Sequence, residues 1–231
     1  MCSVTVIIPT LNEEENIDLL LTRLLAVRRE SGLGFSILFV DSASTDGTGE
    51  KVMAWREKGD ISLLCRDPDD DLMEVVVAGA CAAKTRFVVV MDADLSHPPE
   101  ILPELVAPLL DGSCDMVIGS RYVAGGATPD WPFYRRFASK LATIPARLFT
   151  DVKDPLAGFF AVERQRLATL DGSVHGFKIG LEVLAEGGRS LRVKEVPIIF
   201  RDRSFGVSKM NFRVVFHYLV QLFQLLVKKF R

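Results

Sequence analysis

The sequence predicts an α/β fold in which helices flank a mostly parallel β-sheet. Short runs of apolar, often β-branched residues recur through the first half of the chain, and segments of helical periodicity separate them. The chain has 231 residues, of which 48% are hydrophobic, so it is long enough to form one large core. These observations exclude a disordered or fibrous protein.

The first half is expected to form five strands joined by helices. Pro9 bounds the first strand, and Asn12 is expected to cap the helix that follows, with Glu15 completing a capping box. A polar turn after the second strand leads into another helix. The expected strands are residues 4–8, 35–40, 61–65, 87–91 and 116–119.

The second half is less regular. Residues 131–150 have the pattern of an amphipathic helix, which Pro145 is expected to kink. Residues 193–200 are expected to form a strand and residues 201–209 a charged loop. A final helix is expected over residues 211–231.

Three polar segments directly follow predicted strands: residues 10–12, 41–46 and 92–94. Ligands bind beyond the carboxyl ends of the strands in such sheets, so these segments are expected to form one site. Asp41 is expected to contact a nucleoside, because a carboxylate at a strand end suits a base or a ribose hydroxyl. Asp46 is expected only to cap the next helix.

Asp92 and Asp94 follow a buried strand and are separated by Ala93. Mg²⁺ and Mn²⁺ prefer carboxylate oxygens and bridge them to phosphates. An isolated pair of this kind is more often a solvated turn. Its place at a strand end, beside two other polar strand ends, favours a metal site.

Basic residues form two further candidates. Arg135 and Ser139 lie four residues apart, hence on one helix face, and together with Arg121 they could bind a phosphate. Arg203 and Lys209 lie in the later charged loop. A solvated surface is the alternative for both groups. The chain has neither a P-loop nor a Gly-x-Gly-x-x-Gly motif, and its net charge of −2 disfavours nucleic-acid binding.

Together these motifs resemble family 2 glycosyltransferases, and within them the dolichol-phosphate mannose synthases and related polyprenyl-phosphate hexose synthases. The resemblance implies a glycosyltransferase-A type fold. It also implies transfer of a hexose from a nucleotide diphosphate sugar to a polyprenyl phosphate. The motifs are residues 4–13, 40–48, 92–95, 119–122, 154–160 and 203–210.

The resemblance also implies roles for individual residues. The nucleotide sugar would be bound by Pro9, Thr10, Glu13, Asp41, Asp92, Ala93, Asp94, Arg203 and Lys209. The acceptor phosphate would be bound by Arg121, Arg135 and Ser139, and Mg²⁺ or Mn²⁺ by Asp92, Asp94 and Ser96. The candidates for catalysis are Asp94, Arg121, Arg135, Arg203 and Lys209.

The sequence departs from the family pattern at three places. Ser42 replaces a second acid after the second strand, Ser96 replaces a glutamine that serves as a metal ligand, and residues 67–74 replace a glycine-rich stretch. Mannose from GDP-mannose is the favoured donor, with glucose from UDP-glucose as the alternative. A family 2 enzyme acting on a saccharide and an inactive nucleotide-sugar-binding scaffold also stay open.

The expected reaction inverts the anomeric carbon. A phosphate monoester has a second pKa near 6, so the nucleophile is already ionised at neutral pH and needs no general base. The protein has to position two anions and stabilise the leaving diphosphate.

The buried strands and the last helix together account for much of a mean hydropathy of +0.23 in a sequence without a spanning segment. The pattern of the last helix is a polar stripe on a broad apolar cylinder, which favours a helix in the membrane interface, with a core or dimer helix as the alternative. We therefore expect a catalytic domain at residues 1–210 and an interfacial helix at 211–231. No signal peptide is expected, which predicts a peripheral protein on the cytosolic face of a membrane. The sequence predicts no oligomeric state.

Overall fold

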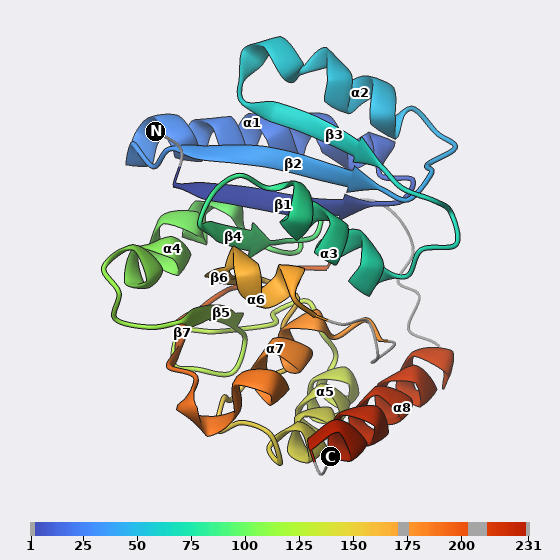
Figure 1. Cartoon of the computed structure of the whole chain (residues 1–231), viewed down its shortest axis with the longest axis vertical. Coiled ribbons are helices and arrows are strands. Elements are labelled where there is room, and N and C mark those ends of the chain that lie inside the picture. Colours follow the sequence, from blue (N-terminus) through green and yellow to red (C-terminus); the bar gives the residue numbers. More distant parts are fainter. Residues whose placement is uncertain (1–2, 171–175, 203–211, 230–231) are drawn as a thin grey trace.

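A computed structural model describes residues 3–170, 176–202 and 212–229, and shows the predicted α/β architecture (Figure 1). A seven-stranded sheet has the order β3-β2-β1-β4-β6-β5-β7. The strands are β1 (Val4–Thr10), β2 (Phe35–Asp41), β3 (Ile61–Cys65), β4 (Phe87–Val90), β5 (Met116–Ser120), β6 (Phe160–Glu163) and β7 (Val193–Pro197). The helices are α1 (Glu14–Ser31), α2 (Thr48–Ala54), α3 (Leu72–Ala82), α4 (Leu102–Leu110), α5 (Phe133–Ala146), α6 (Arg164–Ala168), α7 (Ile179–Gly187) and α8 (Phe212–Lys229).

The sheet is mostly parallel, as the sequence predicts. β1 pairs in parallel with β2 and β4, β2 with β3, and β5 with β7. The exception is β6, which runs antiparallel to both of its neighbours, β4 and β5. The sequence pattern does not predict β6, because its four residues include only one β-branched residue, Val162.

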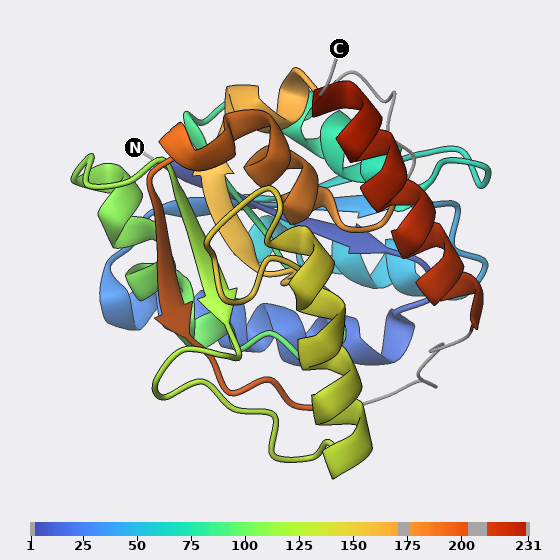
Figure 2. The ribbon, with the colours of Figure 1, turned by 90° about the horizontal axis from the view of Figure 1, so that it is seen from below.

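Both faces of the sheet are covered. Along β1, alternate residues point to opposite faces, so that Val6 and Ile8 pack in the core beneath α1 and α4, while Ile7 packs in the core beneath α3 and α7. A third apolar cluster joins α5, α7 and α8 at one end of the molecule, through residues such as Phe149, Leu181 and Leu222. Figure 2, seen from below, shows α5 and α8 together at that end.

Several predicted boundaries are wrong by a few residues. Pro9 lies within β1 rather than beyond it. The amphipathic helix α5 is shorter than residues 131–150 and ends one residue after Pro145, with no long kinked segment. β7 ends at Pro197, although Ile199 still forms a bridge with Ala127. The charged loop lies outside the described residues from position 203 onward.

The predicted capping box at the start of α1 is also wrong. Asn12 adopts a left-handed backbone conformation, with φ of 57°, and its side-chain oxygen accepts a hydrogen bond from the Thr45 amide at 2.9 Å. The helix begins at Glu14, whose amide donates to the Asp46 carboxylate at 3.1 Å. The same carboxylate accepts the Thr48 amide at 3.0 Å, so Asp46 pairs with the first amide of α2 from one position before Gly47, which holds the N-cap position. Asp46, in the loop after β2, therefore accepts hydrogen bonds from backbone amides at the start of both α1 and α2.

Candidate active site

A cavity of about 520 Å³ opens at the carboxyl edge of the sheet. The strand pairing brings the ends of three strands together at this edge, because Thr10 of β1 pairs with Asp41 of β2 and β4 ends next to β1. The polar segments that the sequence singled out thus meet at one edge. Of the predicted site residues, those lining the cavity are Pro9, Thr10, Glu13, Asp92, Ala93, Asp94 and Arg121.

Asp41 is placed behind this cavity rather than in its lining. It is buried, and its carboxylate accepts hydrogen bonds from the Thr10 hydroxyl at 2.8 Å, the Ser44 hydroxyl at 2.6 Å and the Ser44 amide at 2.8 Å. Ser42, the residue that departs from the family pattern, lines the cavity instead. The nucleoside contact of Asp41 stays a prediction, and in this structure Asp41 fixes Thr10.

The Asp92-Ala93-Asp94 segment forms a tight turn after β4. The Asp92 side chain is 46% exposed and the Asp94 side chain is buried, and both line the cavity. The Asp94 carboxylate accepts the Ser96 amide at 3.0 Å. Leu95, between them, has a left-handed φ of 64°, which is strained for a branched side chain. The turn thus holds two carboxylates at the cavity edge at the cost of local strain.

The carboxylates of Asp92 and Asp94, both in the cavity lining, fit a divalent metal ion. Ser96, the third predicted ligand, is not in that lining, and its buried hydroxyl has no hydrogen-bond partner among the described residues. Within the described part of the chain, no three side chains of the His, Cys, Asp and Glu types form a metal cluster. Such a site would be completed by oxygens of a bound ligand, as is common for Mg²⁺.

Lys178 lines the same cavity, although no sequence pattern indicates it. Its ammonium donates to the Leu156 carbonyl at 3.2 Å. Burial, and then the nearby Arg121 guanidinium, lower the pKa of Lys178 to about 8. Lys178 precedes α7 without any neighbouring motif, so only the fold shows that it faces the carboxylates.

The Arg121 guanidinium forms two hydrogen bonds with the buried Asp154 carboxylate, at 2.8 and 2.7 Å, and the Arg121 amide donates to the same group at 2.9 Å. The Asp154 side chain is fully buried and that of Arg121 is 11% exposed. Burial opposes the charged form of Arg121, but the bonds to Asp154 outweigh it and raise the pKa of Arg121. Tyr122, Trp131 and Phe200 present their rings to the guanidinium. Arg121 is thus a fixed cation.

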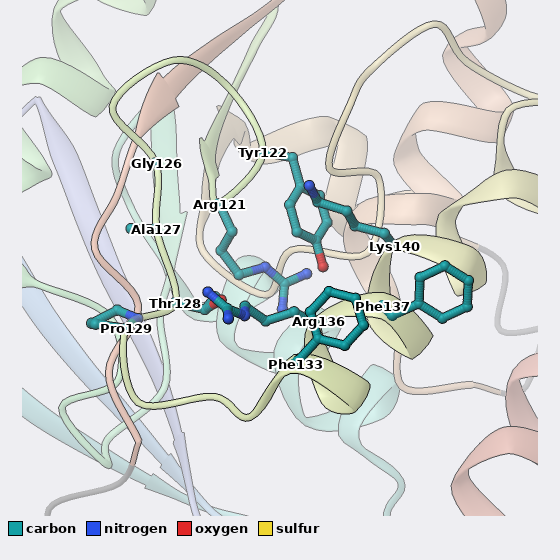
Figure 3. A pocket seen from close by; sticks show the side chains of 10 residues that line it. All are labelled: Arg121, Tyr122, Gly126, Ala127, Thr128, Pro129, Phe133, Arg136, Phe137 and Lys140. Carbon is teal, nitrogen blue, oxygen red and sulfur yellow. The ribbon is translucent and has the colours of Figure 1, made fainter.

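A second cavity, of about 540 Å³, also has Arg121 in its lining (Figure 3). Two basic residues of α5, Arg136 and Lys140, reach it together with the rings of Phe133 and Phe137. The segment between β5 and α5 closes it with Gly126, Ala127, Thr128 and Pro129. The lining of this cavity thus combines the cations Arg121, Arg136 and Lys140 with the aromatic rings of α5.

Two residues predicted to bind the acceptor phosphate lie outside the lining of this cavity. Arg135 forms an ion pair with Asp202 at 2.8 Å and lies over the Trp131 ring. Ser139 accepts a hydrogen bond from the Tyr122 hydroxyl at 2.7 Å. Arg136, the neighbour of Arg135, lines the cavity instead, because one helix position turns a side chain by about 100°. The phosphate contacts of Arg135 and Ser139 stay predictions.

Among the described residues, Arg121 is the one that lines both cavities. The first cavity carries carboxylates and Lys178, and the second carries basic and aromatic side chains. A fixed guanidinium between two such spaces could contact an anion on each side. Arg203 and Lys209, which were expected to close the site, lie outside the described residues.

Helices α5 and α8 expose apolar side chains at the end of the molecule shown in Figure 2. Those of α5 are Phe133, Tyr134, Phe137, Leu141 and Ile144, and Leu148 follows the helix. Those of α8 are Leu219, Phe223 and Val227, while its Tyr218, Leu222 and Leu225 pack in the third cluster. The last helix is thus partly a core helix and partly exposed. Among the described helices, none has the length and apolar character needed to span a membrane.

Comparisons with known proteins agree with this architecture. Residues 5–170 match the family described as glycosyl transferase family 2. A dolichol-phosphate mannosyltransferase of Pyrococcus furiosus is 40% identical over 96% of this chain, and the chain spans 63% of that protein's length. A dolichol-phosphate mannosyltransferase of Saccharomyces cerevisiae is 38% identical, over 98% of this chain and 88% of the yeast protein.

The structure is also similar to a solved enzyme. Glucosyl-3-phosphoglycerate synthase from Mycobacterium tuberculosis, solved with Mn²⁺, UDP-glucose and phosphoglyceric acid, superposes with a TM-score of 0.72. The match covers 98% of this chain and 79% of that one, at 20% identity. At this identity the similarity concerns the fold, which is of the glycosyltransferase-A type, as expected from the sequence.

Proposed function

The chain belongs to glycosyltransferase family 2, and from that membership we propose that it transfers mannose from GDP-mannose to the phosphate of a polyprenyl or dolichyl phosphate. One observation carries the proposal: Arg121 lines both the carboxylate-rich cavity and the cationic, aromatic one. A nucleotide sugar in the first and a lipid phosphate in the second would meet at this residue. The names of the two similar mannosyltransferases support mannose and dolichyl phosphate as substrates.

We place the donor in the cavity lined by Pro9, Thr10, Glu13 and Ala93. Lys178 would offset the negative charge of the diphosphate, together with Arg203 and Lys209 of the segment outside the described residues. The ammonium of Lys178 is held by the Leu156 carbonyl, so it needs little ordering on binding. These cations would stabilise the diphosphate as it leaves.

Asp92, Asp94 and Ser96 would hold Mg²⁺ or Mn²⁺. The ion would supply positive charge next to the leaving diphosphate. The turn that contains the strained Leu95 keeps both carboxylates at the cavity edge, where the ion would bind. If Asp94→Ala left both Mn²⁺ binding, measured by electron paramagnetic resonance, and turnover intact, this part of the proposal would fail.

The acceptor phosphate would bind between Arg121 and the two basic residues of α5, Arg136 and Lys140. A phosphate monoester is largely ionised at neutral pH, so it can attack the anomeric carbon without a general base. Arg121 would offset the repulsion between the two anions and hold the attacking oxygen in line with the donor. Attack from the side opposite the leaving diphosphate predicts inversion of configuration.

The lipid chain of the acceptor explains the exposed apolar face of α5 and α8. This face begins at the second cavity, where Phe133 and Phe137 belong to both. Between Phe133 and Ala146 the helix α5 contains Arg135, Arg136 and Lys140 and no acidic residue, which suits anionic lipid phosphates. We propose that the protein lies with this face on the cytosolic surface of a membrane.

The test is a transfer assay with purified protein, polyprenyl phosphate and either labelled GDP-mannose or labelled UDP-glucose, each with and without Mn²⁺ or Mg²⁺. We expect labelled lipid from GDP-mannose in the presence of metal, and inversion at its anomeric carbon. If only UDP-glucose gave labelled lipid, UDP-glucose would replace GDP-mannose as the proposed donor. No labelled lipid with either donor would refute it, and would favour a nucleotide-sugar-binding scaffold.

A further inference from the structure

The imidazole of His97 occupies an unusual place beside the Asp92-Ala93-Asp94 turn. Its side chain is 3% exposed and stacks on Phe159, with ring centroids 5.1 Å apart and an interplanar angle of 15°. Phe200 contacts it edge-on, at a centroid distance of 5.6 Å. Two aromatic rings therefore fix the plane of a polar ring that lines the donor cavity.

A backbone hydrogen bond fixes the protonation of this ring. The Asp92 amide donates to Nδ1 of His97 at 3.0 Å, so Nδ1 carries the lone pair and the proton of the neutral imidazole lies on Nε2. A ring that accepts this bond at Nδ1 has one N–H donor left, at Nε2.

Nε2–H makes no hydrogen bond to the described residues, and the ring lines the donor cavity, so this N–H is available to a ligand there. Gly158, which also lines the cavity, lies beside the Cε1–Nε2 edge of His97. A β-carbon at Gly158 would lie 3.4 Å from Cε1 and 3.8 Å from Nε2 of His97, and 3.8 Å from the Asp92 carboxylate. The glycine thus leaves the Cε1–Nε2 edge open, beside Asp92.

The Nδ1 bond also closes the turn that carries the carboxylates. Between Asp92 and His97 the chain passes through Leu95, whose left-handed φ of 64° is strained. Such strain persists only where the surroundings hold it, and the bond from the Asp92 amide to a ring clamped by Phe159 is one such restraint.

We propose that His97 is a positioning and binding residue: Nδ1 holds the Asp92 turn, and Nε2–H donates a hydrogen bond to an oxygen of the nucleotide sugar at the Gly158 wall. This inference rests on the proposed function, because it needs a donor in the cavity. The recognised chemistry is an oxygen acceptor, supplied either by the diphosphate or by a hydroxyl of the hexose.

Two substitutions separate the two nitrogens. In His97→Asn, the side-chain oxygen can take the place of Nδ1, but the donor at Nε2 is lost. In His97→Gln, the side-chain amide nitrogen can reach the place of Nε2, but the acceptor for the Asp92 amide is lost. His97→Phe keeps an aromatic ring between Phe159 and Phe200 and loses both functions.

The measurement is calorimetric binding of GDP and of GDP-mannose in the presence of Mn²⁺, with a melting curve for each variant. We expect His97→Asn and His97→Phe to bind about tenfold more weakly and His97→Gln to bind within about threefold of the wild type, as for loss of one hydrogen bond. We expect the melting temperature of His97→Asn to exceed that of His97→Gln. A loss shared by GDP assigns the contact to the diphosphate, and a loss confined to GDP-mannose assigns it to the hexose.

Gly158→Ala provides a variant that leaves His97 in place. Its methyl group would make ordinary contacts, so we expect an unchanged melting temperature and weaker binding of the same nucleotide. Equal binding by the wild type, His97→Asn and Gly158→Ala would overturn the inference while leaving the proposed function intact. A wild-type protein that binds neither nucleotide would overturn the proposed function as well.

Discussion

Replacing Asp154 by asparagine tests whether the buried pair with Arg121 holds the centre of the site. The Asp154 carboxylate accepts three hydrogen bonds, all from Arg121, at 2.7, 2.8 and 2.9 Å. The side chain of Asp154 is 0% exposed. In Asp154→Asn an NH₂ group would face N–H donors, and the guanidinium would stay buried without its counter-charge.

The expected loss of stability follows from the burial of both side chains. Breaking a buried ion pair by removing one partner costs about 3–5 kcal/mol. For a domain of this size that corresponds to a fall in melting temperature of about 6–20 °C. We also expect transfer activity to fall by at least about a hundredfold at a temperature where the variant is folded, because Arg121 loses its orientation.

The chain offers a matched control. Asp115 accepts the same three bonds from Arg192, from the amide at 3.0 Å, from Nε at 3.1 Å and from Nη2 at 2.7 Å. These side chains are 27% and 59% exposed, so solvent screens the pair. The assay is urea unfolding of both variants. We expect the loss for Asp115→Asn to be at most about a third of that for Asp154→Asn, and equal losses would refute the reasoning.

Three further predictions concern the cavity walls and the apolar face. The pKa of Lys178 is lowered to about 8, so its positive charge is present below that pH and is lost above it. The affinity for GDP, measured by calorimetry, should therefore fall as the pH rises through about 8. The variant Lys178→Met should show no such fall. Phe137, 61% exposed, should dock on lipid, so Phe137→Glu should lower binding to anionic vesicles about tenfold in a sedimentation assay, unlike Leu110→Glu at a 46% exposed position on α4. In steady-state kinetics, Arg136→Gln should raise KM for polyprenyl phosphate about tenfold, whereas Arg135→Gln should raise it less, because Arg135 already has an ion pair. Vesicle binding that is unaffected by the change at Phe137, or equal effects of the two arginines, would contradict these assignments.

The sequence predicts the parallel part of the sheet and the meeting of its polar ends well, because both follow from local patterns. Buried strands such as β2 are contiguous apolar runs, and a parallel sheet brings their carboxyl ends together. The turn of Asp92 and Asp94 is therefore found from the sequence alone. The antiparallel strand β6 is not, because it has one β-branched residue, whereas the equally short β4 has three.

What the sequence cannot predict depends on contacts between distant segments. Arg121 is fixed by Asp154, which lies 33 positions along the chain. Asn12 is a residue type that often caps helices, but its side-chain oxygen accepts a hydrogen bond from Thr45 in the loop after β2 instead. On α5 the sequence indicates one basic face, and only the structure shows that Arg136 rather than Arg135 reaches the cavity.

The central claim is that donor and acceptor meet at Arg121, and two-substrate kinetics of Arg121→Lys test it most directly. Lysine keeps the charge but cannot form the paired hydrogen bonds with Asp154. With donor and polyprenyl phosphate varied in turn, and folding checked by circular dichroism, we expect KM for both substrates to rise and kcat to fall by at least about a hundredfold. A variant in which KM changes for only one substrate, with kcat intact, would contradict the account.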